Sequence, residues 1–130
     1  MAKLMIIDDD EINNFTVEAM LERIDFVDHY QIRDSGESAL TYLKEAVENN
    51  TFPDYIFVDI NMPIMNGFQF LEQYEQLYKD RYPDTHICML SSSMNKSDEE
   101  KSLSYHCVSR YETKPLNKTK LEKIVLNQAG

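Results

Sequence analysis

Five side chains with useful chemistry each follow a short run of strand-forming residues. In chain order these side chains are Asp8, Asp9, Asp59, Ser91 and Lys114. In a parallel sheet the carboxyl ends of all strands lie at one edge, and open α/β sheets bind their ligands there. If the runs are parallel strands, three carboxylates, one hydroxyl and one ammonium therefore meet at that edge.

Such a group of side chains suits the transfer of a phosphoryl group to a carboxylate. Three carboxylates in one place repel one another, so the arrangement costs free energy without a counter-charge. A hard divalent cation with oxygen ligands removes the conflict, and Mg²⁺ is the favoured candidate because it keeps positions for water and phosphate oxygens. Lys114 and Ser91 could then hold the remaining phosphoryl oxygens.

The elements that must position these residues alternate along the chain. Five runs are predicted as strands, at 4–7, 30–33, 55–58, 87–90 and 108–113. A predicted helix follows each run, and this alternation implies a parallel sheet with right-handed crossovers. The sequence therefore predicts an α/β fold, a doubly wound five-stranded parallel sheet with helices on both faces, as one domain over residues 1–130. The second run is polar enough to be an edge strand.

Capping residues predict where the helices begin. Asp9 or Asp10 could cap a first helix, whose apolar residues at positions 12, 15, 19, 20 and 24 have a helical period through about Ile24. Ser97, with Glu100 three residues later, has the pattern of a capping box for the fourth helix. The other helices are expected to begin near Ser35, Asn66 and Asn117.

Composition narrows the range of partners and compartments. The formal net charge is −10, from 23 acidic and 13 basic residues. This charge repels phosphate backbones and anionic lipid, so neither nucleic acid nor a membrane surface is expected as a partner. No apolar stretch approaches the ~18 residues of a membrane span, and the N-terminus lacks the features of a signal peptide. Cys88 and Cys107 are expected as free thiols, which predicts a cytoplasmic protein.

The chain resembles the receiver domain of two-component response regulators and is related to the single-domain chemotaxis regulator. The resemblance covers essentially the whole chain and rests on four segments at the predicted strand ends. These segments are Ile7-Asp8-Asp9, Val58-Asp59 with Met62-Pro63-Ile64-Met65-Asn66-Gly67, Leu90-Ser91-Ser92, and Lys114-Pro115. The resemblance implies the flavodoxin-like receiver fold and a stand-alone receiver without an output domain.

The resemblance also implies a role for each matching position. Asp59 would be the phosphoacceptor, and Ser91 and Lys114 would each bind a phosphoryl oxygen. The Lys114-Pro115 peptide would be cis, a form that X-Pro bonds adopt at modest cost. Mg²⁺ would be bound directly by Asp9 and mostly through water by Asp8, and its other ligands would be Asp59 and the backbone carbonyl of Asn61.

Tyr111 stands three residues before Lys114, where the family has its switch aromatic. On activation Ser91 would move toward the phosphoryl group, Tyr111 would rotate inward, and the face of the fourth helix, fifth strand and fifth helix would change shape. The alternative is an ordinary strand aromatic with its hydroxyl at the surface.

The implied partners are a histidine kinase or histidine phosphotransfer protein and a downstream protein target. The domain would catalyse only its own phosphorylation and dephosphorylation, as a monomer or a phosphorylation-dependent dimer.

Two other classes of protein fit part of the pattern. In a haloacid dehalogenase-like phosphatase Asp8 would be the nucleophile, but that class needs an acidic pair after the lysine. Glu122 is the only acidic residue that follows Lys114, and Asp59 would have no role in such an enzyme. A receiver-like interaction module that is not phosphorylated usually lacks one of the acids, the acceptor or the lysine, whereas this sequence has the full set.

Overall fold

The computed structural model describes residues 2–126; residue 1 and residues 127–130, the two ends of the predicted domain, lie outside the described residues. The described chain alternates five strands and five helices. They are β1 (Ala2–Ile7), α1 (Glu11–Leu21), β2 (Val27–Arg33), α2 (Gly36–Asn49), β3 (Tyr55–Asp59), α3 (Gly67–Leu77), β4 (His86–Ser91), α4 (Lys96–Leu103), β5 (Val108–Thr113) and α5 (Lys118–Leu126). None of these helices is long and apolar enough to cross a membrane.

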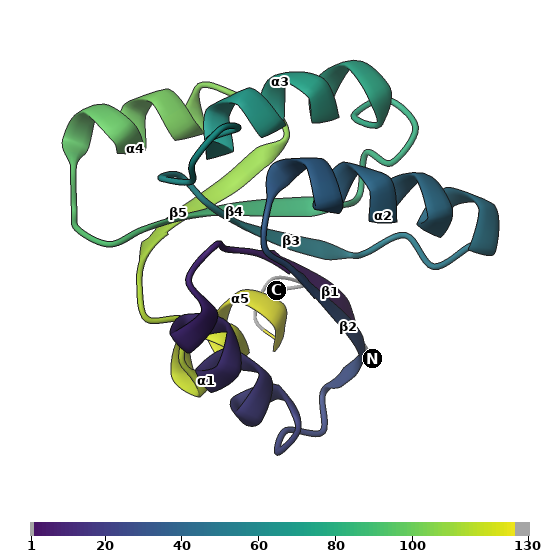
Figure 1. Cartoon of the computed structure of the whole chain (residues 1–130), viewed down its shortest axis with the longest axis vertical. Coiled ribbons are helices and arrows are strands. Elements are labelled where there is room, and N and C mark those ends of the chain that lie inside the picture. The colour runs from purple at the N-terminus through teal and green to yellow at the C-terminus, as the bar shows by residue number, and fades with distance from the viewer. Residues whose placement is uncertain (1, 127–130) are drawn as a thin grey trace.

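The five strands form one parallel sheet in the order β2-β1-β3-β4-β5. Helices α2, α3 and α4 lie on one side of the sheet and α1 and α5 on the other (Figure 1). The doubly wound fold predicted from the sequence is therefore confirmed, and the second strand is at an edge, as its polar composition indicated.

Two apolar cores hold the helices to the sheet. Side chains of a strand point alternately to its two faces. In β1, Met5 and Ile7 accordingly belong to the core under α2 and α3, whereas Leu4 and Ile6 belong to the core under α1 and α5. All four are at most 1% exposed. Full burial of one such side chain stabilises the fold by ~1.5–3 kcal/mol, so the central strands are firmly held.

Short polar side chains begin most helices where the sequence predicted. Asp10, not Asp9, caps α1, and Ser35 caps α2. Asn66 and Gln69 form a reciprocal capping box at the start of α3. Asn117 accepts a hydrogen bond from the backbone N–H of Lys120 at the start of α5.

The predicted cap of α4 is wrong. Asn95, with extended backbone angles, accepts a hydrogen bond from the backbone N–H of Asp98 at 3.1 Å. Ser97 lies inside the first turn, where its backbone is already helical. An asparagine oxygen caps a helix as well as a serine hydroxyl does, so the helix begins two residues earlier than predicted.

Helix α1 also differs from the prediction. It ends at Leu21 rather than near Ile24, because the chain turns back into β2, which begins at Val27. Its buried residues are Val17 and Leu21, whereas Ile12 and Phe15 are 80% and 74% exposed. At 3.6 residues per turn, Ile12 and Phe15 lie roughly 140° to 160° around the helix from Val17. The apolar stripe predicted for this helix is therefore not its buried face.

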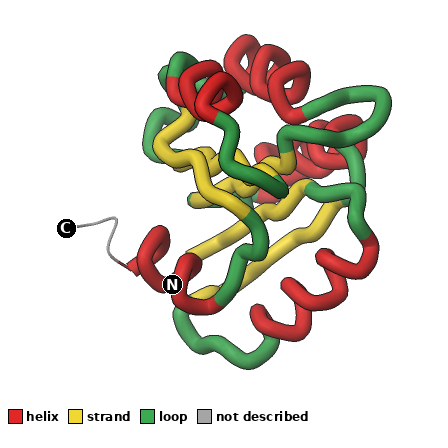
Figure 2. The backbone as a smooth tube through the Cα atoms, turned by 90° about the vertical axis from the view of Figure 1, so that its left-hand side faces the viewer, coloured by secondary structure: helices red, strands yellow, loops and turns green. Residues whose placement is uncertain are grey.

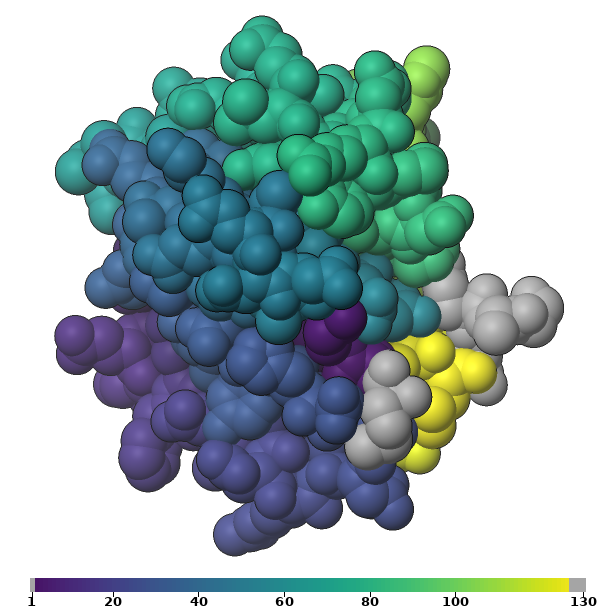
Figure 3. Space-filling model, turned by 90° about the vertical axis from the view of Figure 1, so that its right-hand side faces the viewer, coloured from purple at the N-terminus to yellow at the C-terminus, as the bar shows by residue number. Residues whose placement is uncertain are grey.

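The edge of the sheet where the strands end differs from the edge where they begin. Figure 2 faces the edge where the strands end and their loops gather, and Figure 3 faces the opposite edge, where the strands begin. A hollow of about 580 Å³ lies where the strands begin, lined by residues that include Ala2, Tyr55 and His86. This hollow therefore lies at the edge opposite to the side chains that follow the strands.

Candidate functional site

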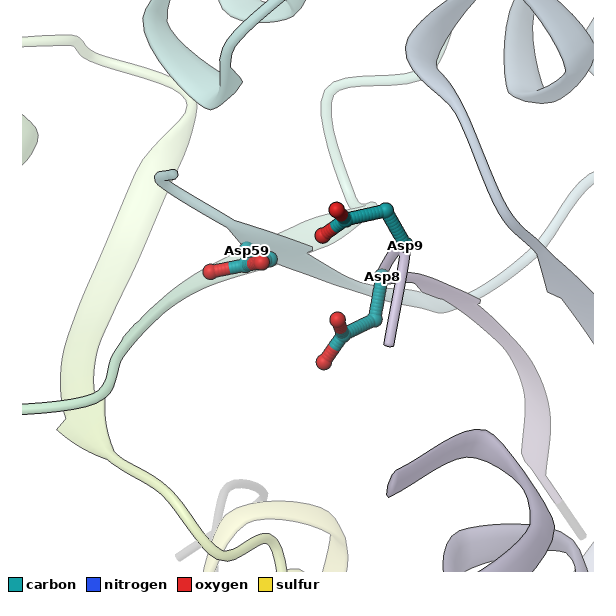
Figure 4. Close-up of side chains that lie close together, drawn as sticks. All are labelled: Asp8, Asp9 and Asp59. Atoms are coloured by element: carbon teal, nitrogen blue, oxygen red, sulfur yellow. The ribbon is translucent and has the colours of Figure 1, made fainter. Parts of the chain in front are cut away.

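Three carboxylates meet where β1 and β3 end. Asp8 and Asp9 follow β1, Asp59 is the last residue of β3, and one oxygen of each lies within 4.8 Å of the others. The carboxylate of Asp9 points toward Asp59, and that of Asp8 points to the side of α1 and α5 (Figure 4). Asp8 and Asp59 are 0% and 4% exposed, whereas Asp9 is open to solvent. The cluster therefore opens outward at Asp9.

Lys114 supplies the positive charge beside these carboxylates. Its Nζ lies 2.7 Å from Oδ2 of Asp8 and 3.4 Å from Oδ2 of Asp59. Its backbone N–H donates to the carbonyl of Ser91 at 2.8 Å, and the Lys114-Pro115 peptide is cis, as the resemblance implied. Burial alone would lower the pKa of Lys114, but the hydrogen bond and charge of Asp8, with the charge of Asp59, raise it overall. The ammonium is therefore held in its charged form.

The electrostatics of Asp59 fit a cation. Burial, followed by the negative charge of Asp8, raises the pKa of Asp59 to about 6, although Lys114 and the backbone N–H of Asn61 oppose the shift. One ammonium thus does not neutralise the cluster. An oxygen-only set of ligands with excess negative charge is what hard divalent cations bind, so these residues fit Mg²⁺.

This pKa gives an expected pH dependence for the metal-free protein. Because the pKa of Asp59 is raised in the folded state, ionisation of Asp59 opposes folding; this cost is absent below about pH 4, grows between about pH 4 and pH 6, and stays constant at higher pH. Near neutral pH in a chelator, Asp59→Asn should be more stable than the wild type by about 2 to 3 kcal/mol. Urea unfolding of both proteins across this range measures the difference. A difference in free energy of unfolding between the two proteins that stays the same from pH 4 to 7 would contradict this expectation.

Ser91 and Tyr111 belong to one chain of hydrogen bonds beside the cluster. The Ser91 hydroxyl donates to the carbonyl of Ser93 at 2.7 Å, and the Tyr111 hydroxyl donates to the same carbonyl at 3.3 Å. The backbone N–H of Asn95, the cap of α4, donates to the Tyr111 hydroxyl at 3.3 Å. Tyr111 is only 9% exposed and packs in the core under α2 and α3. The ring of Tyr111 is therefore already turned inward in this structure, whereas the predicted rotation would start from an outward ring.

The loop after Asp59 folds back tightly on the end of β3. The backbone N–H of Asn61 donates to Oδ1 of Asp59 at 3.3 Å, and that of Gly67 donates to the carbonyl of Ile60 at 2.9 Å. A Cβ atom at Gly67 would lie 2.7 Å from the Asp59 carbonyl oxygen and 2.9 Å from the Ile60 Cα. Glycine is therefore required there for this return of the loop.

Ile64, within this loop, has a strained backbone. Its φ is 68°, and its side chain is 91% exposed. The backbone N–H of Met65 donates to the carbonyl of Pro63 at 2.8 Å, so Ile64 is the central residue of a tight three-residue turn. A positive φ is unfavourable for a β-branched residue, whereas asparagine tolerates one, as Asn50 does with a φ of 58° at the end of α2.

Ile64→Asn should therefore raise the free energy of unfolding by about 1 kcal/mol. The reciprocal variant Asn50→Ile should lower it by a similar amount, and chemical denaturation measures both. A destabilised Ile64→Asn protein would show that the loop conformation is not strained.

The site thus brings together Asp8, Asp9, Asp59 and Lys114, and joins Ser91 to Lys114 through the backbone. The hydroxyl of Ser91 is turned to the Ser93 carbonyl, an orientation that the sequence did not predict. Sequence reasoning also missed Asn13, whose side-chain amide donates to Asp8 at 2.8 Å. Its position in the first turn of the helix after the acidic pair was the available signal.

Comparison with known proteins places the chain among signalling domains. A family model described as the response regulator receiver domain matches residues 4–126. The signal transduction histidine-protein kinase BarA of Shigella flexneri is 31% identical over 95% of this chain and 12% of its own length. The three curated relatives, all histidine kinases by name, are matched over only 7% to 13% of their length, so the chain spans about a tenth of them.

Solved structures agree with this match. A two-component response regulator from Cytophaga hutchinsonii is 30% identical, with 96% of this chain and 94% of that one covered and a TM-score of 0.88. The Mn²⁺-bound form of response regulator Rcp1 is 25% identical, with 98% and 91% covered and a TM-score of 0.72.

Proposed function

The chain belongs to the response regulator receiver domain family, and on that premise we propose that Asp59 accepts a phosphoryl group from a histidine kinase or a histidine phosphotransfer protein. The observation that carries the proposal is the single edge at which Asp59, two further carboxylates and Lys114 meet. Because Asp59 is 4% exposed, a donor must approach from that edge.

The chain's own residues suffice to outline the transfer. A carboxylate oxygen of Asp59 attacks phosphorus in line, a P–O bond forms, and the P–N bond to the donor's imidazole breaks. Lys114, which contacts both Asp8 and Asp59, turns its ammonium to one phosphoryl oxygen. Ser91 turns its hydroxyl from the Ser93 carbonyl to another. Both contacts stabilise the charge of the transferring group.

Asp8, Asp9, Asp59 and the backbone carbonyl of Asn61 are the residues that would hold Mg²⁺. When bound, Mg²⁺ supplies positive charge that neutralises the phosphoryl oxygens as the new bond forms. Burial and the negative charge of Asp8, which together raise the pKa of Asp59, support the assignment, and the related Rcp1 structure is of a Mn²⁺-bound form. Asp9, the exposed member, is the open side by which a cation enters.

Tyr111 and Asn95 are proposed to report the modification. When the Ser91 hydroxyl turns away, the Ser93 carbonyl loses that donor and keeps the Tyr111 hydroxyl. The change is passed to α4, because the Tyr111 hydroxyl also accepts a hydrogen bond from the backbone N–H of Asn95, the residue that caps α4. The downstream target is a protein that binds the face of α4, β5 and α5, either to a monomer or to a phosphorylation-dependent dimer.

The chemistry stays within the domain. It promotes its own phosphorylation and dephosphorylation and turns over no separate substrate. We further propose a cytoplasmic location, which suits the free thiols of Cys88 and Cys107.

Acetyl phosphate provides the direct test, because it needs no partner protein. The purified chain is incubated with acetyl phosphate and Mg²⁺, and its intact mass is measured. The expected result is a gain of one phosphoryl group, which a chelator prevents. An unchanged mass, or a gain that persists in the chelator, would contradict the proposal.

A further inference from the structure

Asp8 has no exposed surface, and every polar atom of the residue beyond its backbone N–H has a donor. The backbone N–H of Asp10 donates to Oδ1 at 3.0 Å, and the side-chain amide of Asn14 donates to the backbone carbonyl at 2.7 Å. Oδ2 accepts from two groups, the amide of Asn13 at 2.8 Å and Lys114 at 2.7 Å. Because an ionised carboxylate only accepts hydrogen bonds, Asn13 must present its nitrogen there.

The position of Asn13 is fixed by its helix and by the cap of that helix. It lies in the first turn of α1, and its backbone N–H donates to the capping carboxylate of Asp10 at 3.1 Å. The cap and the helix therefore set the origin of the side chain, and one hydrogen bond directs its amide at Asp8. Such a preorganised donor orients a buried carboxylate at little further cost in conformational entropy.

Lys114 and Asn13 share one oxygen of Asp8 but differ in charge. The ammonium repels an incoming cation and, in the proposed transfer, turns to a phosphoryl oxygen. The neutral amide does neither. Once Lys114 has turned, Asn13 is the donor that still holds this oxygen, and it leaves the negative charge of Asp8 available to the metal.

We propose that Asn13 is a positioning residue for the metal site: its amide holds the carboxylate of Asp8 in the orientation that serves Mg²⁺ and replaces Lys114 when the ammonium turns away. The inference rests on the proposed function. It adds a residue of α1 to a site otherwise built from residues at the ends of the strands. Loss of a partner that orients a metal-binding group typically lowers metal affinity 10- to 100-fold.

The test is Mg²⁺ binding to the metal-free protein, measured by calorimetry without any phosphodonor. Asn13→Leu keeps the shape of the side chain and removes the donor. Asn14→Leu is the matched control, since Asn14 donates to the backbone of Asp8 and not to its carboxylate. The dissociation constant should rise about tenfold or more in Asn13→Leu and stay near the wild-type value in Asn14→Leu. Asn13→Ala serves the same purpose if the leucine variant does not fold.

A second readout separates positioning from general damage to the fold. In Asn13→Leu the rate of phosphorylation by acetyl phosphate should return to the wild-type value at saturating Mg²⁺, because only the affinity is impaired. Unchanged Mg²⁺ affinity in Asn13→Leu, an equal loss in both variants, or a rate that excess Mg²⁺ does not restore overturns the inference. Failure of the proposed function is distinct, because a wild type that binds Mg²⁺ would then gain no phosphoryl group.

Discussion

Asp59→Asn is expected to gain no phosphoryl group in acetyl phosphate and Mg²⁺, under conditions that modify the wild type completely. An amide lacks the nucleophilic oxygen anion that attacks phosphorus, so the loss should be total rather than partial. The substitution keeps the shape of a side chain that is 4% exposed, so the variant should fold. Intact mass after a fixed incubation measures the effect.

Asp54→Asn is the matched control for this result. Asp54 directly precedes β3, at the opposite edge of the sheet, where its carboxylate accepts a hydrogen bond from the backbone N–H of Lys3 at 2.9 Å. It should be phosphorylated like the wild type. Full modification of Asp59→Asn would place the acceptor elsewhere in the chain.

Lys114→Met is expected to destabilise the metal-free protein by about 3 kcal/mol, the scale of removing one partner from a buried ion pair. The reason is Asp8, which has no exposed surface and would lose an ammonium at 2.7 Å. Urea unfolding in a chelator near neutral pH measures the loss. Lys118→Met, which removes an exposed lysine of α5, should change the free energy of unfolding little.

Two additions should recover part of the stability that Lys114→Met loses. The second substitution Asp8→Asn removes the unpaired charge, and Mg²⁺ replaces the missing counter-charge. Neither should restore normal phosphorylation, because the ammonium that binds a phosphoryl oxygen is still absent. A Lys114→Met protein as stable as the wild type in the chelator would show that Asp8 does not depend on this ion pair.

The parallel sheet and the convergence of the strand-end side chains could be predicted, because both follow from the alternation of strands and helices. Apolar runs of strand length alternate with helical segments, so the sheet is parallel, and the residues after its strands share an edge. Asp8, Asp9, Asp59 and Lys114 therefore come together as expected, within the distances of an ion pair or a shared metal.

The remaining features depend on tertiary packing that a local pattern does not carry. Val17 faces the sheet in α1 and Phe15 does not, which periodicity alone could not decide between two apolar stripes. The cap of α4 is Asn95, although the capping-box pattern of Ser97 and Glu100 pointed to Ser97. The positive φ of Ile64 contradicts the preference of that residue; it belongs to the tight turn that the hydrogen bond from the Met65 N–H to the Pro63 carbonyl closes.

The most direct test of Asp59 as the acceptor is to locate the phosphoryl group. The protein is phosphorylated with acetyl phosphate and Mg²⁺, and borohydride then reduces the acyl phosphate, which converts the modified aspartate to homoserine. Peptide mapping by mass spectrometry should find homoserine at position 59 alone. Homoserine at Asp8 or Asp9, or at no position of a phosphorylated chain, would contradict the assignment.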